Sequence, residues 1–379
     1  MPFHTSRHGL TVQSHRVSPQ EAYSLLESPW QELQCIQHTK FFLSWQWIGQ
    51  WLISLPKDIK VNTFAVYRNS VLVAVAAVPE RCRKSIFGRV KQGYLNRTGE
   101  DELDQVWIEN NKVLTTLVGA VDIASIYEVI IETAKLDELM IMVMSGDDYV
   151  NATEFKLLNS KYNVEVEYEE NGYYLPIHHD INVEKKYSKS LKRQLKQTVN
   201  AASSLGMNLR FEVINDSIHM IQLLEASEFW HIAKWDGTST PSGFTNTHFK
   251  NFHKALISQT GSSACGRRVR MFALWDGDAL LGILYGLQEG DWFGFYLSSI
   301  KPMDDNRLRL GLYMHHMAIH AMSACGVLVY DFMAGEARYK KQFGSLCMSY
   351  GKMKIQRKRL SIQAENWLKR MKMLLKNKS

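Results

Sequence analysis

Residues able to bind a phosphate and to transfer a proton follow one another late in the chain. The basic residues are Arg307 and Arg309, just before Gly311, and the proton-transfer candidates are Asp331, Tyr339 and Lys340. A basic, glycine-containing loop that opens a helix binds anions, because unpaired N–H groups and the positive helix end face one point. Two arginines add bidentate phosphate contacts. Phosphate binding beside proton-transfer groups suggests group transfer from a phosphorylated carrier.

The elements around these residues form a strand, a loop, a helix and a second strand. Residues 292–300 are aromatic and apolar, which predicts a strand. The helix after the loop carries Leu312, Met317 and Ile319 as apolar positions and stops at Gly326, a residue suited to the left-handed C-terminal conformation. Residues 327–333 are apolar except for Asp331, which is typical of a strand buried on both faces.

The string YDFMAGEARYK, residues 330–340, followed by Phe343 and Gly344, resembles the closing motif of the FemAB-like acyltransferases in the GNAT superfamily. More narrowly, it is similar to acetyltransferases associated with cellulose and exopolysaccharide clusters. The resemblance extends from Phe41 to Met353 and is strongest after Lys185. It implies an α/β fold with two tandem GNAT-like (acyl-CoA N-acyltransferase) domains, whose mixed sheets are flanked by helices.

An internal repeat agrees with two tandem domains. FAVYRNSVLVAV begins at Phe64 and FALWDGDALLGI begins at Phe272, and both predict a strand, a polar turn and a strand. They align without a gap at an offset of 272 − 64 = 208 residues. An aromatic helix is expected before each hairpin, and the first, residues 41–55, has three tryptophans that we expect in the core.

The resemblance also implies roles for individual residues. Acyl-CoA, such as acetyl-CoA, is the expected co-substrate, and direct attack of an amine or hydroxyl on its thioester is the expected reaction. Tyr339 would protonate the leaving thiolate, and Asp331 would act as base, orient the acceptor or cap the next helix. The expected coenzyme-binding residues are Ser298, Arg307, Arg309, Leu310, Gly311 and Leu312. The expected acceptor-binding residues are Lys234, Trp235, Glu336 and Lys340.

The loop is a variant of the general GNAT pattern Gln/Arg-x-x-Gly-x-Gly/Ala. With Arg307 in the first place, Leu310 stands fourth and Gly311 falls after it. An N–H group of the 296–299 strand would bind the developing oxyanion.

Length and composition predict a soluble globular protein of two domains. The chain has 379 residues, a net charge of +7, five scattered cysteines and no apolar leader. We expect a cytoplasmic protein with residues 1–17 as a tail, 18–181 as a GNAT-like domain with a degenerate coenzyme site, 182–355 as the acyltransferase domain and 356–379 as a basic helix. The first domain lacks an arginine-and-glycine loop, so we expect it to shape the acceptor cleft.

The C-terminal segment is amphipathic, with Leu360, Ala364, Trp367 and Met371 on one helical face. Docking of that face on its own domain is the favoured expectation, and peripheral contact with an anionic membrane is the alternative. His316 and His320 have the spacing of two metal ligands, but no third ligand is visible in sequence, so no metal is expected.

The sequence leaves three functions open. The first is acyl-CoA-dependent N- or O-acyl transfer to an amino sugar, a polysaccharide precursor or a peptide amine. The second is a Fem-type transferase that takes an amino acid from aminoacyl-tRNA, and no specific nucleic acid is expected otherwise. The third is a non-catalytic scaffold in envelope polysaccharide synthesis.

Overall fold

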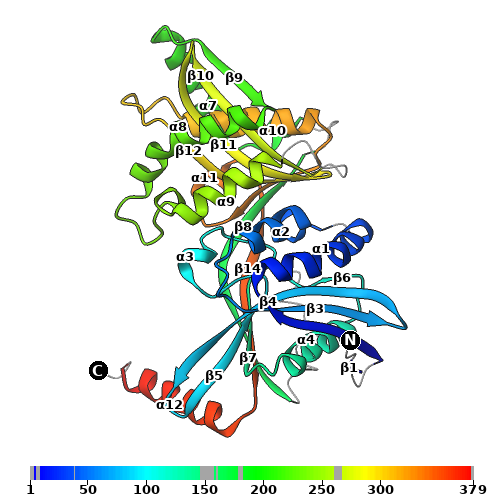
Figure 1. Cartoon of the computed structure of the whole chain (residues 1–379). Helices are drawn as coiled ribbons and strands as arrows, with labels where there is room; N and C mark the ends of the chain where they lie inside the picture. Colours follow the sequence, from blue (N-terminus) through cyan, green and yellow to red (C-terminus); the bar gives the residue numbers. More distant parts are fainter. Residues whose placement is uncertain are drawn as a thin grey trace. The chain divides into compact units, whose positions relative to one another are not determined.

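The computed structural model describes residues 4–5, 9–37, 39–145, 158, 161–177, 182–259 and 267–376. Two compact units are present: unit 1 comprises residues 1–169 and 350–379, and unit 2 comprises residues 170–349 (Figure 1). The chain leaves unit 1 inside β8 (Tyr162–Pro176) and returns to it inside β14 (Leu346–Arg357). The predicted boundaries at 181 and 355 are therefore displaced, because boundaries inside two strands leave no breaker residues to mark them.

Unit 1 is a mixed sheet with helices packed against it. Its strands run in the order β2 (Leu10–Val17), β3 (Val61–Arg68), β4 (Val71–Ser85), β5 (Gly88–Tyr94), β7 (Glu138–Ser145) and the second part of β14. The short strands are β1 (His4–Thr5) and β6 (Leu114–Thr115). The helices are α1 (Pro19–Ile36), α2 (Trp45–Ser54), α3 (Asp101–Asp104), α4 (Ala120–Thr133) and α12 (Leu360–Lys376), with a 3₁₀ turn, η1 (Phe41–Leu43).

The prediction of a tail up to residue 17 is wrong for β2. This strand pairs with β3 from Leu10↔Arg68 to Val17↔Val61. Leu10 and Val12 are fully buried, so alternate side chains of β2 belong to the core. Helix α1 begins at Pro19, where Ser18 and Glu21 form a capping box.

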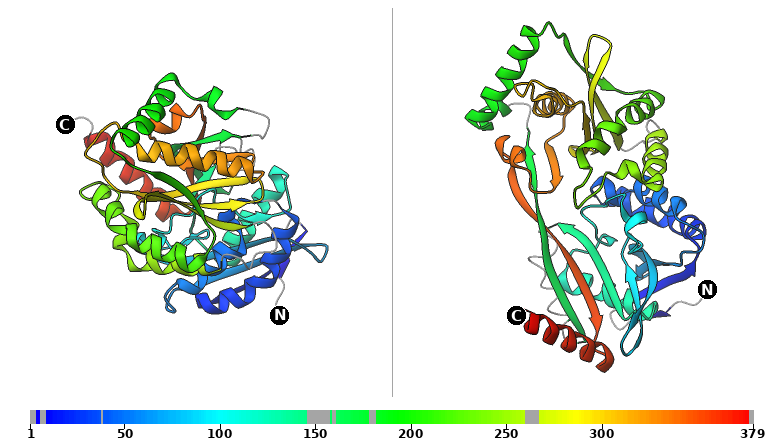
Figure 2. Two further views of the ribbon diagram at one scale, coloured as in Figure 1. Left: turned by 90° about the horizontal axis from the view of Figure 1, so that it is seen from above. Right: turned by 90° about the vertical axis from the view of Figure 1, so that its left-hand side faces the viewer.

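Unit 2 repeats this design. Its sheet has the order β9 (Leu209–Ile214), β10 (Arg268–Asp276), β11 (Ala279–Glu289), β12 (Trp292–Ile300), β13 (Val329–Ala334) and the second part of β8. The helices are η2 (Val183–Lys186), α7 (Lys189–Ser204), α8 (Ser217–Trp235), η3 (Gly243–Thr245), α9 (Thr247–Ser258), α10 (Leu310–Ala324) and α11 (Arg338–Gln342). Helices α7 and α10 lie on one face of the sheet, and α8 and α9 lie on the other (Figures 1 and 2).

The predicted duplication is visible in the hydrogen-bond register. Phe64 pairs with Ala76 in unit 1, and Phe272 pairs with Leu284 in unit 2, so both members are offset by 208 residues. The register shift after Val66 recurs after Leu274, again at the offset 274 − 66 = 208. The protein thus has an α/β fold of two tandem units. The three tryptophans of α2 are buried in the core of unit 1, as expected.

Helix α12 contradicts the predicted mode of docking. It belongs to unit 1, where Ile362 and the acidic Glu365 are buried. The Glu365 carboxylate accepts hydrogen bonds from Arg83 at 2.6 Å and from Ser85 at 2.6 Å. The predicted apolar face is instead open, with Leu360 85% and Trp367 61% exposed. An ion pair with a residue 282 positions away fixed the orientation of the helix, and a helical wheel cannot show such a partner.

Candidate active site of unit 2

Two parallel strands separate in unit 2 and leave an opening in the sheet. β12 and β13 pair only from Trp292↔Val329 to Gly294↔Asp331, although β12 continues to Ile300. A bulge in the pairing with β11 coincides with this separation, because Tyr285 faces Leu297 and Gly286 faces Phe295, which leaves Tyr296 unopposed. Beyond Gly294, β12 still pairs with β11 but no longer pairs with β13, so the backbone groups on its β13 side lie outside the ladder. Ligands commonly bind at such carboxyl ends of strands.

Asp331 supports the end of β13. Its carboxylate is 1% exposed and accepts hydrogen bonds from Trp292 Nε1 at 3.1 Å and from the Met333 amide at 2.8 Å. Met333 has a φ of 63°, a left-handed value that is costly for a residue with a long side chain. The bond from Asp331 stabilises this turn. The structure thus places Asp331 beneath the opening, in contact with backbone and with Trp292.

Lys340 also stabilises the turn at Met333, through its ammonium group. Its ammonium donates to the carbonyl oxygens of Met333 at 3.0 Å and Ala334 at 2.6 Å, and the residue is only 4% exposed. A buried ammonium is tolerated when its donors are satisfied. Lys340 is therefore committed to the backbone of β13. Glu336, by contrast, is exposed and accepts a hydrogen bond from Asn171 of β8.

Tyr339 lies on His315 of α10. The two rings stack with centroids 5.2 Å apart and an angle of 26° between their planes. Burial raises the pKa of Tyr339, so its phenol stays protonated at neutral pH. No residue within the described ranges forms a hydrogen bond to this hydroxyl. Tyr339 therefore has the protonation state and the free hydroxyl required of a proton donor.

His315 is a neutral support for that phenol. Burial, followed by the charges of Lys340 and Lys234, lowers the pKa of His315 to about 3. Its Nδ1 lies 2.9 Å from the hydroxyl of Tyr330. The imidazole is thus fixed between two tyrosines and uncharged at neutral pH.

The N-terminus of α10 has no side-chain cap. Arg309 is the N-cap residue and makes no capping hydrogen bond. The three other helices of at least ten residues in the described part of unit 2 are capped by Ser188, Asp216 and Asn246. The first turn of α10 presents the amides of Leu310, Gly311 and Leu312, the residues predicted for coenzyme binding. An uncapped N-terminus binds anions through such amides and through the helix dipole.

The loop before α10 contains both predicted arginines, in different situations. Arg307 forms an ion pair with Asp305 at 2.7 Å and lowers the pKa of that carboxyl to about 2. Arg309 is exposed and has no ion pair with the described residues. Of the two guanidiniums, that of Arg309 is the one available to a ligand.

Thr198 of α7 braces this loop and was not predicted. Its buried hydroxyl accepts from the Arg309 amide at 3.1 Å, and its one proton is shared between the carbonyl oxygens of Gln194 at 3.0 Å and Arg307 at 3.1 Å. The only signal in sequence is one threonine within a lysine-rich helix. Ser298, also predicted, lies in β12 in register with Leu284.

Comparison with known proteins agrees with this architecture. Residues 189–341 match the family model described as an acetyltransferase (GNAT) domain. No curated protein matched the chain. The structure of FemX is similar, with a TM-score of 0.55 and 9% identity over 90% of this chain and 96% of that one.

Two further solved structures are similar. One, described as the C-terminal domain of a lysylphosphatidylglycerol synthetase from Agrobacterium fabrum, has a TM-score of 0.52 and 8% identity over 89% of this chain and 93% of that chain. The other, a conserved protein of unknown function from Bacteroides thetaiotaomicron, has a TM-score of 0.50 and 9% identity over 87% and 97% of the two chains. Residues 189–341, which form most of unit 2, therefore have a GNAT-type acyltransferase fold. At these identities the likeness to solved structures concerns the fold alone.

Lys234 and Trp235 lie at the end of α8 in the second GNAT-type unit. The Lys234 ammonium is 5.7 Å from the centroid of the Trp235 ring, and burial lowers the pKa of Lys234. The charge of Lys234 is one of the causes that lower the pKa of His315, after burial and the charge of Lys340. The role of Lys234 and Trp235 in binding an acceptor stays a prediction.

A buried histidine stands behind the bulge of this GNAT-type unit. His253 of α9 has its Nδ1 3.1 Å from the Tyr285 hydroxyl and its Nε2 3.2 Å from the Tyr296 hydroxyl. Burial lowers the pKa of His253 to about 3, so the ring is neutral. His253 therefore links α9 to the unopposed residue of β12. The sequence pattern gave no sign of the two tyrosine partners of His253.

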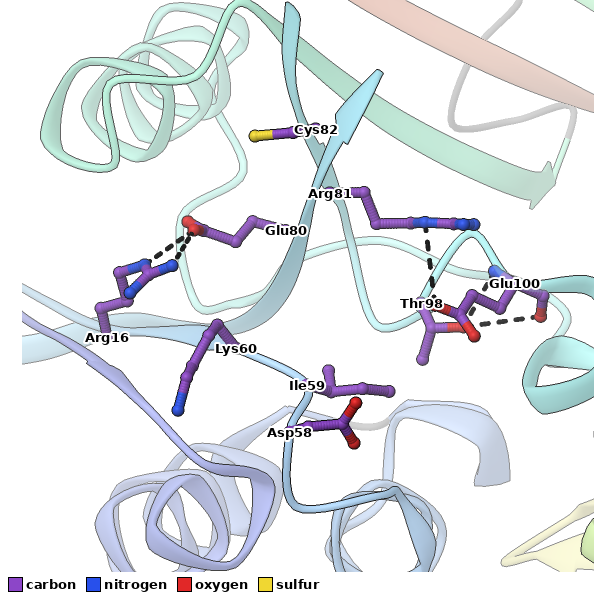
Figure 3. A pocket seen from close by; sticks show the side chains of 9 residues that line it. All are labelled: Arg16, Asp58, Ile59, Lys60, Glu80, Arg81, Cys82, Thr98 and Glu100. Carbon is purple, nitrogen blue, oxygen red and sulfur yellow. Dashed lines mark hydrogen bonds and ion pairs between the residues drawn. The ribbon is translucent and has the colours of Figure 1, made fainter. Parts of the chain in front are cut away.

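Unit 1 has a different surface feature. A polar depression of about 250 Å³ is lined by Arg16, Asp58, Ile59, Lys60, Glu80, Arg81, Cys82, Thr98 and Glu100. Arg16 faces Glu80 at 2.6 Å, and Arg81 reaches toward Glu100 at 3.8 Å (Figure 3). Three basic and three acidic side chains balance in this lining, so it does not resemble an anion site.

Proposed function

We propose that the protein is an acyltransferase whose donor thioester enters the opening between β12 and β13. The observation that carries this proposal is the separation of these strands after Gly294 and Asp331. In the chain, β12 leads to the uncapped N-terminus of α10, and β13 leads to the short helix that contains Tyr339. Acyl-CoA has one chemical group suited to the N-terminus of α10 and another suited to Tyr339. Its pyrophosphate is an anion for the helix end, and its thiolate needs a proton donor.

In the proposed reaction, the acceptor amine or hydroxyl attacks the thioester carbonyl directly. A C–N or C–O bond forms as the C–S bond breaks, and the phenol of Tyr339 gives its proton to the departing sulfur. The proton lost by the acceptor returns to Tyr339 through solvent. Holding both substrates in one opening makes the encounter effectively unimolecular, which supplies up to about 7–11 kcal/mol of the barrier reduction. An N–H group of residues 296–299 would stabilise the oxyanion.

The geometry refines the roles proposed for single residues. Arg309, with the amides of Leu310, Gly311 and Leu312, would hold the pyrophosphate, and Arg307 would assist only after leaving Asp305. Ser298 would line the donor side of β12. We assign positioning roles to Asp331 and Lys340, whose buried charges bind the backbone of the turn after β13.

The proposed acceptor site includes Lys234 and Trp235 at the end of α8, with Glu336 at its exposed edge. An amino sugar, a polysaccharide precursor or a peptide amine would meet these groups. We propose a cytoplasmic location, which the free thiols of the described cysteines Cys35, Cys82, Cys325 and Cys347 support. In the described part of the chain, no helix has the length and apolar character needed to cross a bilayer.

A Fem-type transfer from aminoacyl-tRNA is the second candidate. The similarity of this fold to FemX over most of both chains favours keeping it, as does the net charge of +7. The same opening would then receive an aminoacyl ester in place of a thioester.

A thermal-shift experiment on the full chain tests the proposal. Acetyl-CoA, longer acyl-CoAs and aminoacyl-tRNA are compared at equal saturation. At 100 times the dissociation constant, a ligand stabilises by about 2.7 kcal/mol, which corresponds to a rise of several degrees in Tm. Stabilisation by coenzyme supports acyl-CoA transfer, stabilisation by charged tRNA supports the Fem-type reaction, and no shift with either contradicts both.

A matched pair of variants locates the binding. Arg309→Ala should weaken coenzyme binding, whereas Arg210→Ala, which removes an arginine of β9 at the far end of the sheet order, should leave it unchanged. Equal binding by both variants would place the donor elsewhere.

A further inference from the structure

Three potential metal ligands converge on the surface of unit 2. They are Glu184 of η2 and the pair His316 and His320 of α10. Glu184 Oε1 lies 3.3 Å from His320 Nε2 and 3.9 Å from His316 Nε2, and the ligand atoms of all three lie within 4.8 Å of one another. The two imidazole rings are 4.6 Å apart. The cluster lies outside the proposed acyl-transfer residues.

These separations suit a small divalent transition metal. Zinc binds imidazole nitrogen and carboxylate oxygen at about 2.0–2.2 Å, and tetrahedral ligands are then about 3.3–3.6 Å apart. The 3.3 Å between Glu184 Oε1 and His320 Nε2 is within that range. The 3.9 Å between Glu184 Oε1 and His316 Nε2 would reach it after a small side-chain rotation. The histidines hold the i, i+4 spacing of ligands on one helix face. Two histidines and one carboxylate leave a fourth position open.

Tyr187 contacts the ring nitrogen of His316 that would face away from the metal. Its hydroxyl lies 3.5 Å from His316 Nδ1, so the other ring nitrogen, Nε2, is the one directed to Glu184. A partner on the second nitrogen is the usual way in which a metal-binding histidine is oriented. Tyr187 is itself fixed by an edge-on contact with Phe343, with centroids 5.1 Å apart.

We propose that Glu184, His316 and His320 form a binding site for a zinc-type divalent cation. Glu184 and His320 are each about half exposed, so the cation enters from solvent and retains water in its open position. Bound metal would join η2 to α10, two segments separated by more than 130 residues in the chain (316 − 184 = 132). It would thereby restrain α10, the helix whose other end is the proposed anion site.

Zinc titration of the tag-free, EDTA-treated full chain tests this site, with isothermal calorimetry and competition against a chromophoric chelator. The wild type should bind one equivalent. His320→Asn and Glu184→Gln should each lower the affinity by at least about 100-fold, because even the loss of a residue that only orients a ligand costs about 10–100-fold. Both side chains are half exposed, so apo variants should unfold at the wild-type temperature.

Controls exclude other ligands. His219→Asn on α8 removes a histidine from another helix, and the double change His178→Asn, His179→Asn removes two histidines outside the described residues; neither should alter binding. Cobalt in place of zinc should lack an intense sulfur-to-metal absorption, which cysteine ligands would produce. Absence of stoichiometric binding by the wild type, or wild-type affinity in either Glu184→Gln or His320→Asn, would overturn the proposal.

Discussion

Acidification below about pH 6.5 should destabilise unit 2, because three of its histidines are buried and neutral. Burial lowers the pKa of His253 and of His315 to about 3, and that of His231 to about 4, from the usual 6.5. Between pH 4.5 and 6.5 the unfolded chain protonates these imidazoles and the folded chain does not. The unfolded state therefore binds more protons, and the stability falls as the pH falls.

Glu289 acts in the opposite sense over part of this range. Burial raises the pKa of Glu289 to about 7, against the opposing effect of the Arg267 guanidinium at 2.6 Å, so below pH 7 the folded chain holds up to one proton there that the unfolded carboxylate releases above pH 4.5. Near pH 5.5, unfolding takes up about three protons on the histidines and releases about one from Glu289, a net uptake of about two. At 1.36 kcal/mol per proton and pH unit, the unfolding free energy of unit 2 should fall by about 3 kcal/mol per pH unit near pH 5.5.

Urea unfolding measured from pH 4.5 to 7.0, with amide hydrogen exchange of peptides from residues 170–349, reports this slope for unit 2. His231→Asn, His253→Asn and His315→Asn should each reduce the slope by about 1 kcal/mol per pH unit, whatever they do to absolute stability. His219→Asn, at a partly exposed position of α8, is the control. A slope unchanged in all three variants, or a stability that rises on acidification, would refute the reasoning.

Three other predictions concern the proposed site and α12. Tyr339→Phe should lower kcat by about 10²-fold or more with donor KM kept, since only the proton donor is lost; an unchanged kcat in steady-state assays would assign the proton to another group. Thr198→Val should raise the Kd for coenzyme several-fold, because the loop loses two hydrogen bonds, while Thr238→Val in the loop after α8 should not. Trp367→Ala should weaken any sedimentation with anionic vesicles, because that ring is 61% exposed beside a basic segment; no binding of the wild type to such vesicles would contradict the membrane contact.

Local patterns predicted the elements of the fold well. Alternation and turn residues located the β3–β4 and β10–β11 hairpins, and their repeat at 208 residues indicated the duplication that the register confirms. The motif around Tyr339 indicated the GNAT-type fold, which the match over residues 189–341 supports. These features are encoded by neighbours in sequence, so periodicity and motif spacing are enough to find them.

Long-range contacts were beyond such patterns. The strand β2 was mistaken for a tail because its burial depends on β3, and α12 was given the wrong docking face because Arg83 selects Glu365. The sequence likewise predicted chemical roles for Asp331 and Lys340. Nothing local indicated that both side chains would bind the backbone of the turn after β13.

The sequence by itself determined which residue types stand beside a strand–loop–helix, and thereby the class of chemistry to consider. The tertiary structure alone decided which of those groups remain available to a ligand. Arg307 is held in an ion pair with Asp305, and Lys340 donates to the backbone of the turn after β13. The Tyr339 ring stacks on His315, and its hydroxyl has no hydrogen-bond partner among the described residues. The reason is physical: a side chain's availability depends on what the rest of the chain packs against it, and those partners lie far away in sequence.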